Sequence, residues 1–135
     1  MPAGYSGTPL WKKLGLAPGF RVKLVDPPPH YERLVAPLPD GITLSGRLRS
    51  DIDLVHAFTR SRTALARGLP RWSEQIRRDG TIWVSWPKRA SGVPTDVTED
   101  VVRELALPLG LVDVKVCAVD DTWSGLKLVI RKELR

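Results

Sequence analysis

The sequence predicts an α/β fold in which a mainly parallel β-sheet carries helices on both faces and ends in an antiparallel hairpin. Three observations predict it: strand-like and helix-like segments alternate, one strand is apolar on both faces, and the last two strands are separated only by a turn. The chain has 135 residues, of which 42% are hydrophobic and 27% charged. This balance is typical of a globular protein, so we expect residues 1–135 to form a single α/β domain.

The first segment, residues 1–17, is predicted to form an N-terminal arm and a short helix. Thr8 can cap this helix, and Pro9 fits its first position. Gly15 can adopt the left-handed conformation that ends a helix. The apolar face through which the helix would dock consists of Leu10, Trp11 and Leu14.

Three strands are predicted next. Residues 20–25 alternate between apolar and polar side chains, and the strand stops at the three prolines of residues 27–29, which have no backbone N–H to continue a sheet. A weak short strand follows at residues 42–44, and a stronger one at residues 53–58.

A helical pattern runs from Ser61 to Arg78, and Gly80 is predicted to stop it. Pro70 lies within the pattern and is predicted to kink the helix or divide it in two. The apolar face that defines the helical period consists of Leu65, Leu69, Trp72 and Ile76.

The strand predicted at residues 81–86 is a nearly continuous apolar run, as expected for a strand in the middle of a sheet. A helix follows it, because Asp96 and Glu99 have the spacing of a capping box. Pro108 and Gly110 are predicted to end this helix.

The last two strands are predicted at residues 114–119 and 126–130, and a turn over residues 120–125 lets them pair as a hairpin. Right-handed crossovers between the earlier strands place helices on both faces of the sheet. A parallel sheet with such a final hairpin is typical of methyltransferase-like folds. We therefore predict a three-layer, Rossmann-like fold of a degenerate methyltransferase-like type.

Loops that follow parallel strands emerge at one edge of the sheet, where ligands of α/β proteins bind. Three predicted loops meet there, at residues 26–30, 86–96 and 120–125. Their donors, flexible backbone and indole ring suit a small anionic or zwitterionic ligand, or a peptide. The predicted ligand-binding residues are His30, Lys88, Arg89, Ser91, Gly92, Asp121, Trp123 and Ser124.

These residues also have structural explanations. Lys88 can anchor an anion, act as a base with a lowered pKa, or extend from the strand end to water. Ser91 and Gly92 can form a tight turn and nothing more, and the Asp120–Asp121 pair is better explained as a turn than as paired catalytic carboxylates. Trp123 can contact a ligand or fold back over the hairpin.

Other reactive side chains indicate little chemistry. His56 lies inside an apolar strand and is interpreted as a core histidine, whereas His30 is the better candidate for a general base. Cys117 lies within a strand and is interpreted as a buried, inert thiol. With one cysteine and two separated histidines, we expect no metal site, and no catalytic residue can be assigned.

The turn after the first strand argues against a nucleotide cofactor. Such a cofactor is normally held by the backbone N–H groups of a glycine-rich turn at this position. Prolines occupy residues 27–29 instead. We therefore expect neither S-adenosylmethionine nor NAD to bind in the usual mode, and no cofactor is predicted.

The net charge of +6 suits an acidic partner, but the basic residues form no continuous block. A solvated basic surface therefore explains the charge better than nucleic-acid binding does.

The sequence has neither a membrane-spanning stretch nor a signal peptide, so we expect no membrane partner and a cytoplasmic location. It does not indicate an oligomeric state. The candidate nucleic-acid contacts are Arg67, Arg71 and Arg78, with Arg47, Arg49, Arg60 and Arg62.

Several motifs are shared with one group of proteins. They are Gly4–Leu10, Trp83–Lys88 with Ala90–Gly92, Asp96–Glu99, and Val116–Asp120 with Thr122–Lys127. In these motifs the chain resembles the bacterial domain-of-unknown-function family number 3052. The resemblance covers nearly the whole chain and implies a small stand-alone bacterial protein. It supplies no reaction, substrate or catalytic residue.

Three functional hypotheses follow. The leading one is a binding domain for an anionic small molecule or peptide at the carboxyl edge of the sheet. The second is a small-molecule transferase or hydrolase that uses Lys88, His30 or Asp121, at least two of which must then meet in a pocket. The third is a nucleic-acid-binding module, whose affinity would fall steeply with salt.

Overall fold

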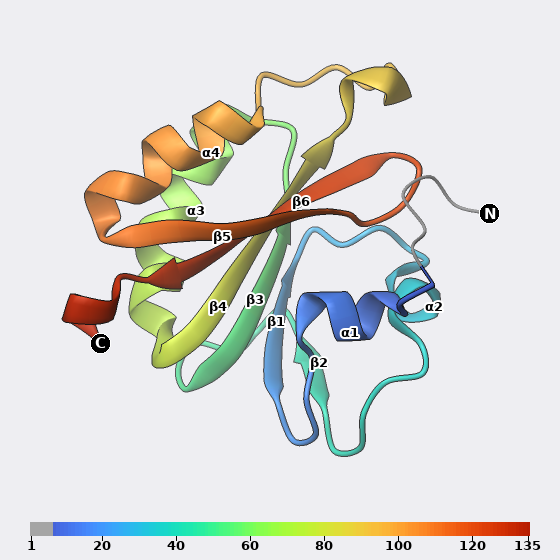
Figure 1. The fold of residues 1–135 in the computed structure, drawn as a ribbon, viewed down its shortest axis with the longest axis vertical. Coiled ribbons are helices and arrows are strands. Elements are labelled where there is room, and N and C mark those ends of the chain that lie inside the picture. Colours follow the sequence, from blue (N-terminus) through green and yellow to red (C-terminus); the bar gives the residue numbers. More distant parts are fainter. Residues whose placement is uncertain (1–6) are drawn as a thin grey trace.

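A computed structural model describes residues 7–135 and shows a six-stranded sheet between helices (Figure 1). The strand order is β2-β1-β3-β4-β6-β5. The strands are β1 (Arg21–Val25), β2 (Thr43–Ser45), β3 (Ile52–Phe58), β4 (Ile76–Pro87), β5 (Leu111–Ala118) and β6 (Trp123–Ile130). The helices are α1 (Leu10–Leu14), α2 (Tyr31–Val35), α3 (Arg62–Gln75) and α4 (Glu99–Ala106), with 3-10 turns η1 (Arg89–Ser91), η2 (Leu107–Leu109) and η3 (Lys132–Leu134).

The first four strands are parallel, and the hairpin of β5 and β6 extends the sheet beyond β4. β1 pairs with β2 on one side and with β3 on the other, and β4 pairs antiparallel with β6. Val22 lies opposite Leu54 in β3, and Trp83 lies opposite Lys127 in β6. The predicted mainly parallel sheet with a C-terminal antiparallel hairpin is therefore confirmed.

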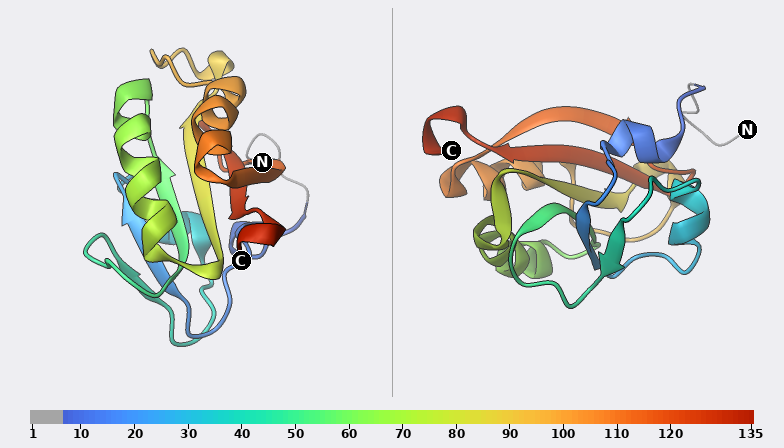
Figure 2. Two further views of the ribbon diagram at one scale, coloured as in Figure 1. Left: turned by 90° about the vertical axis from the view of Figure 1, so that its left-hand side faces the viewer. Right: turned by 90° about the horizontal axis from the view of Figure 1, so that it is seen from below.

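Different pairs of helices cover the two faces of the sheet (Figure 2). One apolar core joins α3 and α4 to the sheet, and a second core joins α1 and α2 to the opposite face. The alternation of β1 explains this division: Val25 faces the first core, whereas Val22 and Leu24 face the second. The three-layer arrangement is confirmed.

β4 lies in the centre of the sheet, as predicted. Its second half is buried on both faces, and Trp83 is fully buried on the side of α1. The indole Nε1 of Trp83 donates a hydrogen bond of 2.9 Å to the carbonyl oxygen of Leu14. This bond joins the short helix α1 to the sheet and satisfies a carbonyl near the C-terminal end of that helix.

A short chain of polar side chains lies buried on the same side. The hydroxyl of Tyr31 lies 2.9 Å from Nδ1 of His56, and Oγ of Ser85 lies 2.8 Å from Nε2. Complete burial lowers the pKa of His56 to about 3, so the imidazole is neutral at pH 7. Because both ring nitrogens have partners inside the core, the interpretation of His56 as a core histidine is confirmed.

The helix predicted over residues 61–78 ends earlier, at Gln75. Ile76 has extended backbone angles (φ −78°, ψ 154°) and begins β4, where it pairs with Ile52. Ile76 is buried in this strand, so the apolar period alone does not distinguish the two structures. Pro70 lies within one helix of 14 residues, so of the two predicted alternatives the division into two helices does not occur.

The N-terminal cap of α4 is Thr98 rather than Asp96. Thr98 has an extended backbone (φ −133°, ψ 172°), and its Oγ1 accepts a hydrogen bond of 3.2 Å from the backbone N–H of Val101. Asp96 instead supports a different helix, α3, whose N-cap is Ser61: Oδ1 of Asp96 accepts a 2.7 Å bond from the backbone N–H of Arg62 at the start of that helix. Asp96 thereby fixes the start of α3 next to the segment that leads into α4.

The short helix α1 also begins one residue later than predicted. Pro9, with φ −59° and ψ 147°, takes the cap position, and no side chain caps the helix, so the predicted role of Thr8 is wrong. Gly15 has φ 82° and ends α1 in the left-handed conformation, as predicted. Residues 1–6 of the predicted arm lie outside the described residues.

The turn of the final hairpin is shorter than the predicted 120–125. β6 begins at Trp123, and Ser124 pairs with Ala118, so both Trp123 and Ser124 lie in a strand rather than in a loop. Gly125 allows β6 to pass close to the core, because a Cβ at this position would lie 3.2 Å from the ring of Trp83. The tight pairing extends the strand beyond what turn residues alone predict.

Candidate functional site

The order of the strands creates a crevice between the carboxyl ends of β1 and β3. From β1 the chain passes to β2 on one side, and from β3 it passes to β4 on the other. Open α/β sheets bind ligands where the strand order reverses in this way. A cavity of about 560 Å³ opens at this point, and we call it the switch-point crevice. Its lining residues are Asp26, Phe58, Thr59, Arg60, Ser61, Ala64, Val93, Thr122 and Trp123.

One wall of the switch-point crevice contains Trp123, whose ring packs on the buried ring of Phe58. Trp123 lies opposite Pro87, the last residue of β4, and its ring meets Phe58 edge-on with the ring centroids 5.1 Å apart. Phe58 in turn stacks on His56 with a centroid distance of 4.3 Å. Trp123 is half-buried, so its ring both packs against the core and borders the crevice.

The loops after β4 and β5 meet at the same end of the sheet, as predicted. The backbone N–H of Lys88 donates a 2.7 Å hydrogen bond to the carbonyl of Thr122, next to Trp123. Ser91 holds the turn that follows, since its Oγ donates to the carbonyl of Lys88 at 2.6 Å. Gly92 ends this turn with φ 74°. Ser91 and Gly92 therefore form a tight turn.

His30 has a carboxylate partner that its position in the sequence does not reveal. Its Nε2 lies 3.3 Å from Oδ2 of Asp120 in the hairpin turn. The other carboxylate oxygen, Oδ1, accepts hydrogen bonds of 2.8 Å from the backbone N–H groups of Thr122 and Trp123. Asp120 is therefore fixed by the turn and orients the imidazole of His30 at the carboxyl edge of the sheet.

The predicted ligand residues surround the switch-point crevice more than they line it. Of the eight, Trp123 is the one that lines the cavity of about 560 Å³. Arg89, Gly92 and Asp121 are exposed, and Ser124 lies in β6 opposite Trp86. Ligand binding by Lys88 and its neighbours therefore stays a prediction.

Sequence reasoning did not single out most of the lining residues. Phe58 is the last residue of the predicted strand 53–58 and Thr59 follows it, so a search of strand ends would have found both. Asp26 and Arg60 come together only because β1 and β3 are neighbours in the sheet. Asp26 has φ 49°, a left-handed conformation that aspartate tolerates better than most residues.

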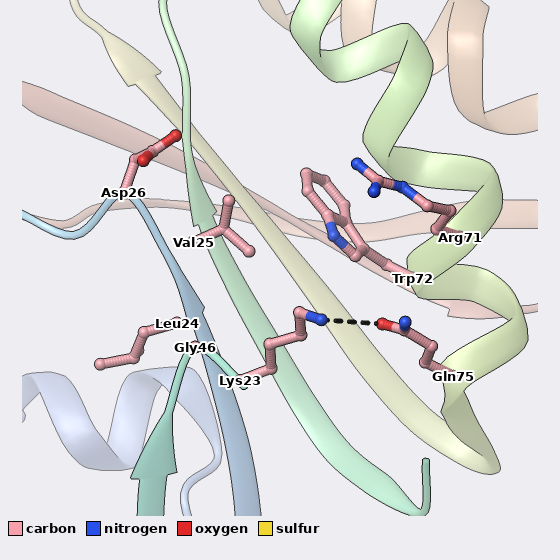
Figure 3. Close-up of a pocket in the computed structure, with 8 residues that line it drawn as sticks. All are labelled: Lys23, Leu24, Val25, Asp26, Gly46, Arg71, Trp72 and Gln75. Carbon is pink, nitrogen blue, oxygen red and sulfur yellow. Dashed lines mark hydrogen bonds between the residues drawn. The ribbon is translucent and has the colours of Figure 1, made fainter. Parts of the chain in front are cut away.

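The crevice continues along the α3 side of β1 as a basic groove. A cavity of about 230 Å³, bordered by Asp26, Arg67 and Arg71, connects it to a third cavity beside Lys23 (Figure 3). Two of the arginines predicted on this surface lie elsewhere: Arg62 pairs with Glu104 at 2.8 Å, and Arg78 donates to the carbonyl of Leu134 at 2.8 Å. The predicted arginine face is thus divided between this groove and other surfaces.

Within residues 7–135, no group of three histidine, cysteine, aspartate or glutamate side chains is placed to hold a metal ion. In the same part of the chain, no helix has both the length and the apolar character that a membrane span requires. Cys117 is half-buried, and burial raises the pKa of its thiol.

The sequence matches no protein-family model and no curated protein. Its architecture, by contrast, is similar to solved structures. An S-adenosylmethionine-dependent methyltransferase from Aquifex aeolicus matches with a TM-score of 0.63 at 13% identity, over 90% of this chain and 88% of that one. An S-adenosylmethionine-dependent O-methyltransferase from Thermotoga maritima matches with a TM-score of 0.61 at 7% identity, over 91% and 64%. A "possible exported protein" from Bordetella parapertussis matches with 0.61 at 12%, over 90% and 66%.

The chain has the Rossmann-like fold of S-adenosylmethionine-dependent methyltransferases. This finding confirms the predicted fold class. At these identities the likeness shows the fold alone, and the chain spans less than two thirds of the Thermotoga enzyme.

The residues after β1 do not fit the cofactor that this fold commonly binds. Pro27, Pro28 and Pro29 offer no N–H groups, and the carbonyl of Pro28 is already bonded to the backbone N–H of Tyr31. The helix that follows, α2, has only 5 residues, so it provides a weak dipole at the turn. The glycine-rich turn and long helix that would hold a nucleotide are therefore absent from the described segment after β1.

Proposed function

We propose that this protein binds a small anionic or zwitterionic molecule in the switch-point crevice. The observation that carries the proposal is a concave cavity of about 560 Å³ at the reversal of strand order, where the fold places ligands. Its volume lies in the range of about 300–1,000 Å³ that is typical of small-molecule sites. A peptide would need a longer open surface, so the crevice favours a small molecule.

The lining residues indicate how such a molecule would be held. The guanidinium of Arg60 and, where the groove begins, that of Arg67 can pair with an anionic group. The half-buried ring of Trp123, supported by the buried ring of Phe58, offers an apolar surface. The carboxylate of Asp26 can pair with a positively charged group of a zwitterion, such as an ammonium.

Binding is favoured over the hydrolase or transferase hypothesis. That hypothesis needs two of Lys88, His30 and Asp121 to meet a substrate in one pocket. None of the three lines the switch-point crevice. A ligand bound there would therefore contact a different set of groups.

Nuclear magnetic resonance of isotopically labelled protein tests the proposal with citrate, phosphoenolpyruvate and adenosine diphosphate as probes. We expect at least one probe to shift the indole N–H of Trp123 and the backbone signals of Phe58 and Thr59, which border the crevice. Arg60→Gln should weaken this binding about tenfold through the loss of a charged hydrogen bond. Arg33→Gln, an exposed change on α2, is the matched control.

Two results would contradict the proposal. One is that none of the three probes shifts the signals of the crevice. The other is that shifts occur around Lys88 and Ser91 alone and disappear in Lys88→Ala, which would move the site to the loop after β4.

A further inference from the structure

A cluster of positive charges lies beside β1, outside the switch-point crevice. Lys23 points from β1 toward α3 into a cavity of about 330 Å³, which Arg71 and Gln75 border from the helix (Figure 3). This cavity opens into a wider one of about 730 Å³, bordered by Arg47 and Arg49 from the loop after β2. Four basic side chains from three separate parts of the chain thus face one space.

The ammonium of Lys23 is held by neutral groups. Its Nζ donates hydrogen bonds of 2.8 Å to the carbonyl of Leu48 and 3.1 Å to Oε1 of Gln75. An ammonium has three hydrogens, so one is left to donate to a ligand. The two neutral acceptors orient the charge without neutralising it.

No carboxylate of the described residues forms an ion pair with this cluster. The ion pairs within residues 7–135 do not include Lys23, Arg47, Arg49 or Arg71. Burial, with the charges of Arg71 and Arg49, lowers the pKa of Lys23. Among the described residues, the smaller cavity is bordered by one carboxylate, that of Asp26 at the end of β1, and the wider cavity by none. An uncompensated cluster of this kind is stabilised by a bound anion.

We propose that this cluster is a binding site for a multiply charged phosphate group, a diphosphate or triphosphate. Guanidinium groups bind phosphate oxygens through paired hydrogen bonds, and an ammonium adds a point charge, so the residue types match this chemistry. The wider cavity, of about 730 Å³, has room for a chain of phosphates rather than a single one. The proposal rests on these residues and does not require a ligand in the switch-point crevice.

The phosphate group has two sources, free polyphosphate or a nucleotide. Arg71 borders both the cluster and the cavity that adjoins the switch-point crevice, so one extended ligand can reach from the cluster to the ring of Trp123. A nucleotide would place its base near Trp123, and a free polyphosphate would not. Nucleic acid is less favoured, because Arg62 and Arg78 lie away from the groove and leave a short basic surface.

Isothermal titration calorimetry of the whole chain with pyrophosphate and with triphosphate tests the site. We expect one molecule bound per chain, with an affinity that falls as salt is added. Arg49→Gln and Arg71→Gln should each weaken binding about tenfold, since each removes a charged hydrogen bond. Both side chains are exposed, so the variants should fold, and Arg33→Gln should bind as the unmodified chain does.

A parallel titration with adenosine diphosphate identifies the source. If Trp123→Ala weakens the binding of adenosine diphosphate and leaves that of pyrophosphate unchanged, the natural source is a nucleotide. If adenosine diphosphate binds Trp123→Ala as tightly as it binds the unmodified chain, the source is free polyphosphate. The proposal fails if pyrophosphate does not bind at low salt, or if the double variant of Arg49 and Arg71 binds it as tightly as the control. Tighter binding of a short single-stranded RNA than of triphosphate would also overturn it. If the crevice is empty but this site is real, the signals of Phe58 and Trp123 stay unchanged while pyrophosphate still releases heat.

Discussion

The buried histidine makes the stability of this protein depend on pH in a way that one substitution can isolate. His56 is completely buried between Tyr31 and Ser85, and burial lowers its pKa from 6.5 to about 3. A lowered pKa means that the unfolded chain binds the proton more tightly than the folded one. The stabilising effect is therefore complete above about pH 6.5 and is lost as the pH falls toward 3.

The magnitude follows from the two pKa values. Between pH 7 and pH 5 the unfolded histidine becomes protonated while the folded one stays neutral, which costs about 2 kcal/mol of the free energy of unfolding. Urea denaturation at a series of pH values measures this loss in the unmodified chain and in His56→Gln, which does not titrate. Carboxylates contribute equally to both proteins, so they cancel in the difference.

Between pH 7 and pH 5 we expect the unmodified chain to lose about 2 kcal/mol of its free energy of unfolding relative to His56→Gln. A difference that stays constant with pH would refute the reasoning. It would mean that His56 is protonated in the core or is reached by water.

Two further predictions concern the helices that flank the crevice. Gly68→Ala should destabilise the protein by about 1–3 kcal/mol, seen as a lower thermal midpoint, because its Cβ would lie 2.4 Å from the ring of Trp72. A higher midpoint would show that the ring can move and that helix propensity dominates. Asp96→Ala should cost about 1 kcal/mol in urea denaturation and increase amide exchange at Arg62, whose N–H it caps. The same increase at the start of α4 would contradict the assignment of that cap to Thr98.

Most elements of the fold were predictable because their signals are local. The apolar run of 81–86 predicts a central strand, and Gly15 ends α1 because glycine adopts φ 82° without strain. The errors occurred where two structures satisfy the same local pattern. Ile76 is apolar in a helix or a strand, and Asp96 can cap either of two helices.

The candidate site was predictable in position but not in composition. The loops after β4 and β5 do meet, and Trp123 does border a cavity, as their places beside parallel strands predict. The pair of His30 and Asp120 joins two loops that lie far apart in the sequence. Nothing in the spacing of these two residues reveals that contact.

Alternation and turn residues determine which side chains of a strand face the same way, since both depend on neighbours along the chain. The sequence therefore establishes that Lys23 and Val25 share a face of β1 and that residues 27–29 end the strand. Which groups meet across space depends on strand order and on the packing of α3, and these are set by burial of apolar surface over the whole domain. Only the folded chain brings Lys23, Arg49 and Arg71 to one cavity. The crevice at Asp26 and Phe58 likewise forms only because β1 and β3 pair side by side in the sheet.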